Sequence, residues 1–135
     1  MKKLLILLLI SSLNSNLIYS DRIAKIGNIE VMGGEFPDTI NYRTRGGEWT
    51  GVPDSMTIFT KRGNEVATNG KLFVAVGEGS VNTIAYSSNG INWIGLGTFI
   101  FSRSGNTVNW TGNEFIARGN GITATSNDGI NWQRS

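Results

Sequence analysis

The sequence predicts an all-β protein made of about three repeated units, each containing four short antiparallel strands. Two stretches are copies of each other: residues 58–93 read IFTKRGNEVATNGKLFVAVGEGSVNTIAYSSNGINW, and residues 100–132 read IFSRSGNTVNWTGNEFIARGNGITATSNDGINW. A more diverged copy precedes them, because TINYRTRGGEW at 39–49 aligns with TIAYSSNGINW at 83–93. Repeats of roughly 40–50 residues with several short strands are typical of propellers and solenoids, whose units need neighbours to bury their faces.

Each predicted unit has the size of one propeller blade, roughly 42 residues in four strands. In the second copy we expect strands at 65–69, 72–76, 83–87 and 92–96. The strand at 72–76 is apolar on both faces, which predicts a strand covered on both sides. No window shows a sustained helical period, so we expect almost no helix in the repeats. The predicted units are residues 21–54, 55–97 and 98–135.

The N-terminus has the pattern of a secretory signal peptide. Lys2 and Lys3 precede an apolar run at 4–10, polar residues follow, and cleavage before Asp21 fits the small-residue rule. The alternative, an uncleaved anchor, needs roughly 20 apolar residues, far more than this run supplies. The sequence therefore predicts a signal peptide at 1–20, an exported domain at 21–135, and no membrane span after cleavage.

Composition narrows the chemistry of the exported domain. The chain has 12 Lys and Arg against 10 Asp and Glu, and two of the lysines belong to the predicted signal peptide, so the domain is formally neutral. No basic stripe with interleaved aromatics supports nucleic-acid binding. The chain has neither Cys nor His, which excludes disulfides, thiolate zinc sites and histidine-based catalysis. We therefore expect no cofactor and no metal.

Two short motifs carry a family resemblance. SSNGINW at 87–93 and SNDGINW at 126–132 resemble the Asp-box, or BNR-type, repeat of sialidase-like β-propellers, although the Ser-to-Trp spacing is one residue shorter than in the usual box. The resemblance covers nearly all of 21–135 and implies a partial propeller of about 2.7 repeats. The residues that it identifies as structural are Ser87, Asn89, Gly90, Trp93, Ser126, Asp128, Gly129, Trp132 and Trp49.

The chemistry of the box residues favours a structural role. A Ser hydroxyl and an Asp or Asn side chain can bind backbone groups of the turn while the indole packs between blades. The alternatives are a calcium ligand or catalytic acid at Asp128, and sugar stacking on the repeated tryptophans. No oxygen-rich partners of Asp128 are visible nearby in the sequence, so we expect the structural role.

Positions where the copies disagree are candidates for contacts. Trp110 falls at a non-repeated position, which makes it a candidate exposed aromatic. Glu114 and Arg118 replace apolar residues of the second unit, consistent with a polar cap on a terminal repeat, an ion pair to a partner, or a ligand site. Arg43 and Arg45 lie in the first unit's box and, with Arg118, resemble the sialidase arginine triad. That triad gathers from separate blades, whereas Arg43 and Arg45 share one hairpin.

About three blades cannot close a ring, because propellers use roughly four to eight. We therefore expect an exported, non-catalytic propeller-type module for protein or ligand binding, completed by self-association or by another propeller-bearing chain. An open pile of small sheets and a relic of a longer propeller remain alternatives. The alternative functions are a glycan-binding or degenerate sialidase-like fragment and a structural component of the cell envelope or surface.

Overall fold

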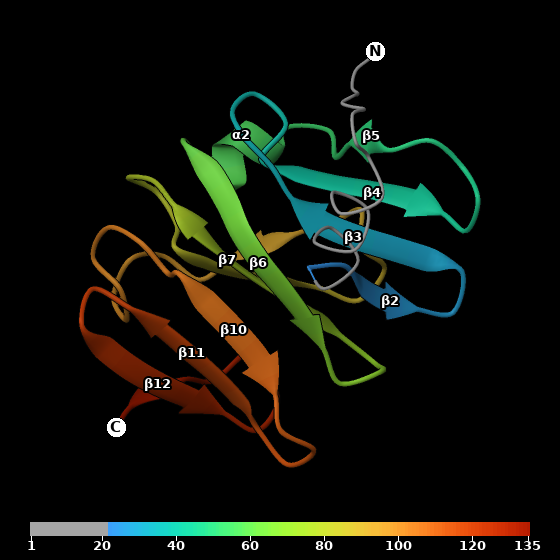
Figure 1. Cartoon of the computed structure of the whole chain (residues 1–135). Helices are drawn as coiled ribbons and strands as arrows, with labels where there is room; N and C mark the ends of the chain where they lie inside the picture. Colours follow the sequence, from blue (N-terminus) through green and yellow to red (C-terminus); the bar gives the residue numbers. More distant parts are fainter. Residues whose placement is uncertain (1–21) are drawn as a thin grey trace, which may run out of the picture.

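The structure confirms the predicted fold class: the described chain folds into three four-stranded antiparallel sheets with almost no helix (Figure 1). It is a computed structural model that describes residues 22–135, so the predicted signal peptide at 1–20 lies outside the described residues. In every sheet the strands are neighbours in chain order. Each sheet is thus a simple meander that corresponds to one repeat.

The three sheets follow one another along the chain. The first contains β2 (Ala24–Ile26), β3 (Ile29–Gly33), β4 (Ile40–Thr44) and β5 (Thr50–Gly51). The short helix α2 (Ser55–Ile58) leads to the second, which contains β6 (Arg62–Thr68), β7 (Phe73–Glu78), β8 (Ile84–Ser87) and β9 (Ile94–Gly95). The third contains β10 (Thr107–Trp110), β11 (Phe115–Gly119), β12 (Ile122–Ser126) and β13 (Gln133–Arg134).

The sheets pack face to face, with the second sheet in the middle. On β7, Phe73 and Ala75 enter a hydrophobic cluster shared with the first sheet, whereas Val74 and Val76 enter a cluster shared with the third. All four side chains are at most 1% exposed. The prediction that this strand is covered on both sides is therefore confirmed, and the alternation of its side chains supplies both interfaces.

Two local features differ from the predicted elements. β6 starts at Arg62, three residues before the predicted strand, because a bulge at Gly63–Glu65 lets Arg62 pair with Glu78. The helix α2 was not predicted, since four residues are too few to show a helical period.

Adjacent units are joined by the same backbone hydrogen bond at equivalent positions. The amide of Gly63 donates to the carbonyl of Gly34 at 2.8 Å, and the amide of Gly105 donates to the carbonyl of Gly77 at 2.9 Å. A Cβ on Gly63 would overlap the carbonyl oxygen of Thr39. Glycine is thus required where the backbone of one unit meets the loop of the previous one.

That loop also holds the start of the next unit through a buried threonine. The Thr39 hydroxyl donates to the Ser55 carbonyl at 2.7 Å, and the equivalent Thr83 donates to the Phe101 carbonyl at 2.7 Å. We call the two loops, residues 34–39 and 78–83, the clasp loops. The third unit has only the two-residue turn Asn120-Gly121, with φ of 51° and 72°. Its β11–β12 connection therefore has no segment to hold a further unit.

Candidate functional site

The box turn of the second unit is fixed by its own side chains. Ser87 Oγ accepts a hydrogen bond from the Gly90 amide at 2.8 Å, and Asn89 Oδ1 accepts from the amides of residues 91 and 92 at 2.9 and 2.8 Å. The Trp93 indole donates back to the Gly90 carbonyl at 2.9 Å. The Ser, Asn and Trp side chains thus supply the partners of a turn that has few backbone partners of its own.

The third unit repeats this geometry with an aspartate. Asp128 Oδ1 accepts from the amides of residues 130 and 131 at 2.8 Å and from the Ser126 hydroxyl at 3.0 Å, while Oδ2 accepts from the Asn131 side chain at 2.7 Å. The backbone amides of Asn131 and then Ile130 hold the pKa of Asp128 far below its ordinary value. The carboxylate is therefore ionised and engaged in the turn.

Each box turn also packs against the preceding unit. Gly129 lies against Leu72 and Val74 of the second unit, where an added Cβ would sit 2.6 and 2.8 Å from their side chains. The Trp132 ring lies 6.4 Å from that of Phe115 and borders the cluster shared with the second sheet. Trp93 lies in the same way, 6.5 Å from Phe73. The box therefore joins units as well as closing a turn.

The first unit departs from this pattern. By strand register, Glu30 and Arg43 stand where the second unit has Phe73 and Ser87. They form an ion pair at 2.6 Å, and the Arg43 guanidinium lies 4.6 Å from the centre of the Trp49 ring. Trp49 was predicted to pack between units, but no unit precedes it in the described chain. It contacts Arg43 instead, on a face that is charged rather than apolar.

The other predicted residue of that box lies apart from this contact. Arg45 is exposed in the turn after β4, and its amide donates to the Asn28 carbonyl at 2.8 Å. Arg118 is exposed on β11, in the third sheet. The structure therefore places Arg43 and Arg45 in the first unit and Arg118 in the third.

The far face of the third sheet is polar. Arg118 lies on the opposite side of β11 from the buried Ala117, and its strand partner on β12 is Thr123. No ion pair of Arg118 occurs within residues 22–135. In the second unit this face carries Val76, which packs on the third sheet. Both end faces of the three-sheet stack are thus more polar than the interfaces inside it.

Trp110 is not an isolated surface aromatic. It is half-buried at the end of β10, its ring lies 4.8 Å from that of Phe115, and it borders the second hydrophobic cluster. Its replacement would therefore disturb packing as well as any contact.

Four predicted residues come together in one pocket of about 420 Å³, which we call the third-unit pocket. Its lining contains an indole, two carboxylates, three amides and two hydroxyls: Trp132, Glu114, Asp128, Asn127, Asn131, Gln133, Thr125 and Ser126. Of these, sequence reasoning identified Glu114, Ser126, Asp128 and Trp132. The second unit keeps part of this lining as Ser87, Asn89, Asn92 and Trp93, but Leu72 and Ile94 replace Glu114 and Gln133.

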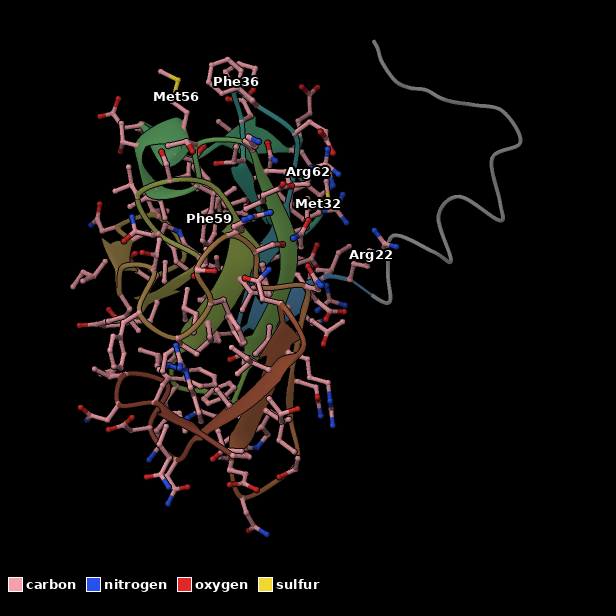
Figure 2. All side chains as sticks on the ribbon, turned by 90° about the vertical axis from the view of Figure 1, so that its left-hand side faces the viewer. Arg22, Met32, Phe36, Met56, Phe59 and Arg62 are labelled. Carbon is pink, nitrogen blue, oxygen red and sulfur yellow. The ribbon has the colours of Figure 1, made fainter. Side chains whose placement is uncertain are left out.

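A second pocket, of about 350 Å³, lies between β6 and β10 and was missed from the sequence. Arg62 contributes to it and forms ion pairs with Glu78 at 3.5 Å and Glu35 at 3.7 Å. Asn64 donates to the Gly105 carbonyl at 2.8 Å. Figure 2 shows Arg62 on the same side of the molecule as Arg22, which also lines the pocket. The repeated Gly-Asn pairs at 63–64 and 105–106 were the available signal.

The fold and these sites define an all-β repeat protein whose units are joined by box turns and clasp loops. No group of three or more acidic side chains that could hold a metal occurs within residues 22–135. The same residues contain no helix that is long and apolar enough to cross a membrane. No protein-family model, curated protein or solved structure matches this chain.

Proposed function

We propose that residues 22–135 form a non-catalytic, propeller-type repeat module of an exported protein, and that it binds a ligand in the third-unit pocket. The observation that carries this proposal is the lining of the pocket, in which the Trp132 indole stands beside the carboxylates and amides of Glu114, Asp128, Asn131 and Gln133. Ligand sites commonly combine an apolar or aromatic surface with a few polar groups that fix orientation.

The use of Asp128 supports a non-catalytic role. A general acid or base must exchange its proton near the working pH. Asp128 instead accepts hydrogen bonds at both oxygens, and its pKa lies far below the ordinary value. Its carboxylate therefore stays ionised and contributes fixed charge and turn geometry to the pocket.

The same lining favours a glycan as the ligand. An indole face provides an apolar platform for a sugar ring, and planar amide and carboxylate groups pair with its hydroxyls. Glu114 and Asp128 make the pocket acidic, and no Lys or Arg lines it. A neutral or amine-bearing sugar therefore fits better than the acidic sugars on which sialidases act.

A glycan array followed by titration of the best ligand tests this function. Residues 21–135 are the form to use, because they contain both hydrophobic clusters. Asn131→Ala should weaken binding about tenfold, because it removes a polar contact to the ligand and the hydrogen bond that orients the Asp128 carboxylate. Asn92→Ala at the equivalent position of the second unit is the control and should bind normally. Absence of any glycan ligand, or equal loss in both variants, would contradict the proposal.

The propeller-type arrangement and the Asp-box relationship belong to the same proposal. Their support is the matching set of Ser, Asn or Asp and Trp hydrogen bonds in the second and third units. The ring-closing self-association expected above remains a prediction. The polar end faces and the missing third clasp loop favour the open stack. Size exclusion with light scattering, followed by a thermal melt, distinguishes these two arrangements. A discrete dimer or trimer supports ring closure between chains, and a monomer that melts cooperatively supports the open stack.

A structural role in the cell envelope is the remaining candidate. It predicts that the protein fractionates with the envelope and binds no glycan. The array and a fractionation experiment therefore separate it from the binding module.

A further inference from the structure

Four exposed apolar side chains lie on loops at one end of the strands. Four of the six large hydrophobic residues that are exposed in the described chain lie on clasp loops or on the connections between units: Phe36 (60% exposed), Met56 (40%), Val81 (53%) and Phe99 (82%). We call these four residues the apolar rim. The remaining two, Ile94 and Ile130, lie on β9 and in the third box turn.

The antiparallel order of the strands places these four loops at the same end. Hydrogen bonds also link them in sequence. The Phe36 amide donates to the Lys61 carbonyl at 3.0 Å, the Asn82 side chain to the Ile58 carbonyl at 3.0 Å, and the Thr83 amide to the Gly97 carbonyl at 3.0 Å. Figure 2 shows Phe36 and Met56 near each other at the top of the molecule, pointing away from its body.

The charges nearest the most exposed rim residue, Phe99, are basic, whereas acidic residues flank two other rim residues: Glu35 and Asp38 lie beside Phe36, and Asp54 lies beside Met56. The Arg134 guanidinium lies 5.5 Å from the centre of the Phe99 ring, and Arg134 Nη2 donates to the Phe99 carbonyl at 2.5 Å. Residues 96–106, which contain Phe99, include Arg103 and no Asp or Glu. A cation beside an exposed aromatic ring suits a surface that is apolar inside and carries phosphates outside.

We propose that the apolar rim inserts into the interfacial region of a phospholipid bilayer and holds the protein at a membrane surface. The rim residues stand on separate loops and line neither of the two pockets described above. Separate projecting side chains suit a fluid acyl boundary, whereas a helical partner needs a continuous groove. Arg103 and Arg134 would meet the lipid phosphates. This inference is independent of the ligand in the third-unit pocket.

Vesicle co-sedimentation tests the inference with a matched pair of variants. The probes are vesicles of phosphatidylcholine alone and of phosphatidylcholine mixed with phosphatidylglycerol. The rim variant is Phe36→Ser with Phe99→Ser, and the control is Ile94→Ser with Ile130→Ser, which removes exposed apolar residues outside the rim. Because the predicted signal peptide is apolar, the full chain and residues 21–135 are measured separately.

Wild-type residues 21–135 should bind both vesicles, because the rim carries acidic as well as basic residues and phosphatidylcholine already supplies lipid phosphates. The rim variant should lower the partition coefficient by about tenfold or more, since each phenylalanine contributes apolar burial. The control should bind as the wild type does. Thermal melts of all three proteins should agree, because the replaced side chains are exposed. Absence of vesicle binding by the wild type, or equal loss in both variants, overturns the inference.

Discussion

Gly129→Ala tests whether the box turn is a packing element between units. Gly129 has φ of +83° and is buried against the second unit. A Cβ there would lie 2.6 Å from Leu72 Cδ2 and 2.8 Å from Val74 Cγ2. Val74 is fully buried and β-branched, so it has little freedom to move aside. The added methyl group therefore collides with the neighbouring unit.

The first unit offers a control that separates this collision from backbone strain. Gly46, in the equivalent turn, has φ of +79°, and no atom lies within 4 Å of the place that an added Cβ would take. Gly46→Ala should cost only the left-handed backbone penalty, about 1–2 kcal/mol. Gly129→Ala adds overpacking of about 1–3 kcal/mol, giving about 2–5 kcal/mol in total. Gly90→Ala, which meets Val31 and Ile29, should also exceed the control.

Urea unfolding followed by circular dichroism and tryptophan fluorescence gives the free energy of unfolding of each variant. The slope of free energy against urea should stay constant, so that the midpoints report stability. If Gly129→Ala is no more destabilising than Gly46→Ala, the box turn does not pack on the preceding unit, and the stacked arrangement of the units is refuted.

Three further predictions concern charge. Because the pKa of Asp128 is lowered in the folded protein, its carboxylate stabilises the fold above its ordinary pKa of 3.8, and this stabilisation is lost as the pH falls below that value. Asp128→Asn should remove this acid sensitivity, and Asn89→Asp should add a second acid-sensitive turn. Urea midpoints measured between neutral and acid pH test both variants. Arg118→Glu should change the free energy of unfolding by less than about 0.5 kcal/mol and leave the oligomeric state in light scattering unchanged. A large loss of stability or a changed oligomeric state would show that Arg118 contacts a partner and is not part of a solvated cap. Glu30→Phe with Arg43→Ser gives the first unit the apolar face of the second and should cause self-association in light scattering, whereas an unchanged monomer would show that the ion pair is no barrier to association.

The fold could be predicted largely because the repeat shows itself in the sequence. Residues 72–76 are apolar at both odd and even positions, which predicted a strand covered on both faces, and β7 is buried on both faces. The start of β6 could not be predicted, since it depends on a bulge and on pairing with Glu78, 16 positions after Arg62. The four-residue helix α2 is likewise too short to leave a periodic pattern.

The candidate sites could be predicted only where their residues lie close together in the sequence. Box residues lie within seven positions of each other, so the turn bonds of the Ser and Asp side chains could be anticipated from the sequence, whereas the bond from the Trp132 indole to the Gly129 carbonyl was not predicted. The Glu30–Arg43 pair depends on the register of β3 and β4, which the sequence does not state. The contact of Asn64 with Gly105 spans 41 positions and forms only when two units stack. Interactions across units therefore required the structure.

The clasp loops make the stack directional, with a consequence for how such a chain can grow. The second unit alone is apolar on both faces and has a clasp loop, so its two sides match those of its own neighbours. A tandem duplication of residues 55–97 should therefore insert a fourth sheet with every joint satisfied. If the third unit were duplicated instead, the added copy would pack against a sheet face that carries Arg118. The two-residue turn of the preceding copy would also be too short to hold it as a clasp loop does. The middle repeat is the transferable module, and the outer two set the length of the array.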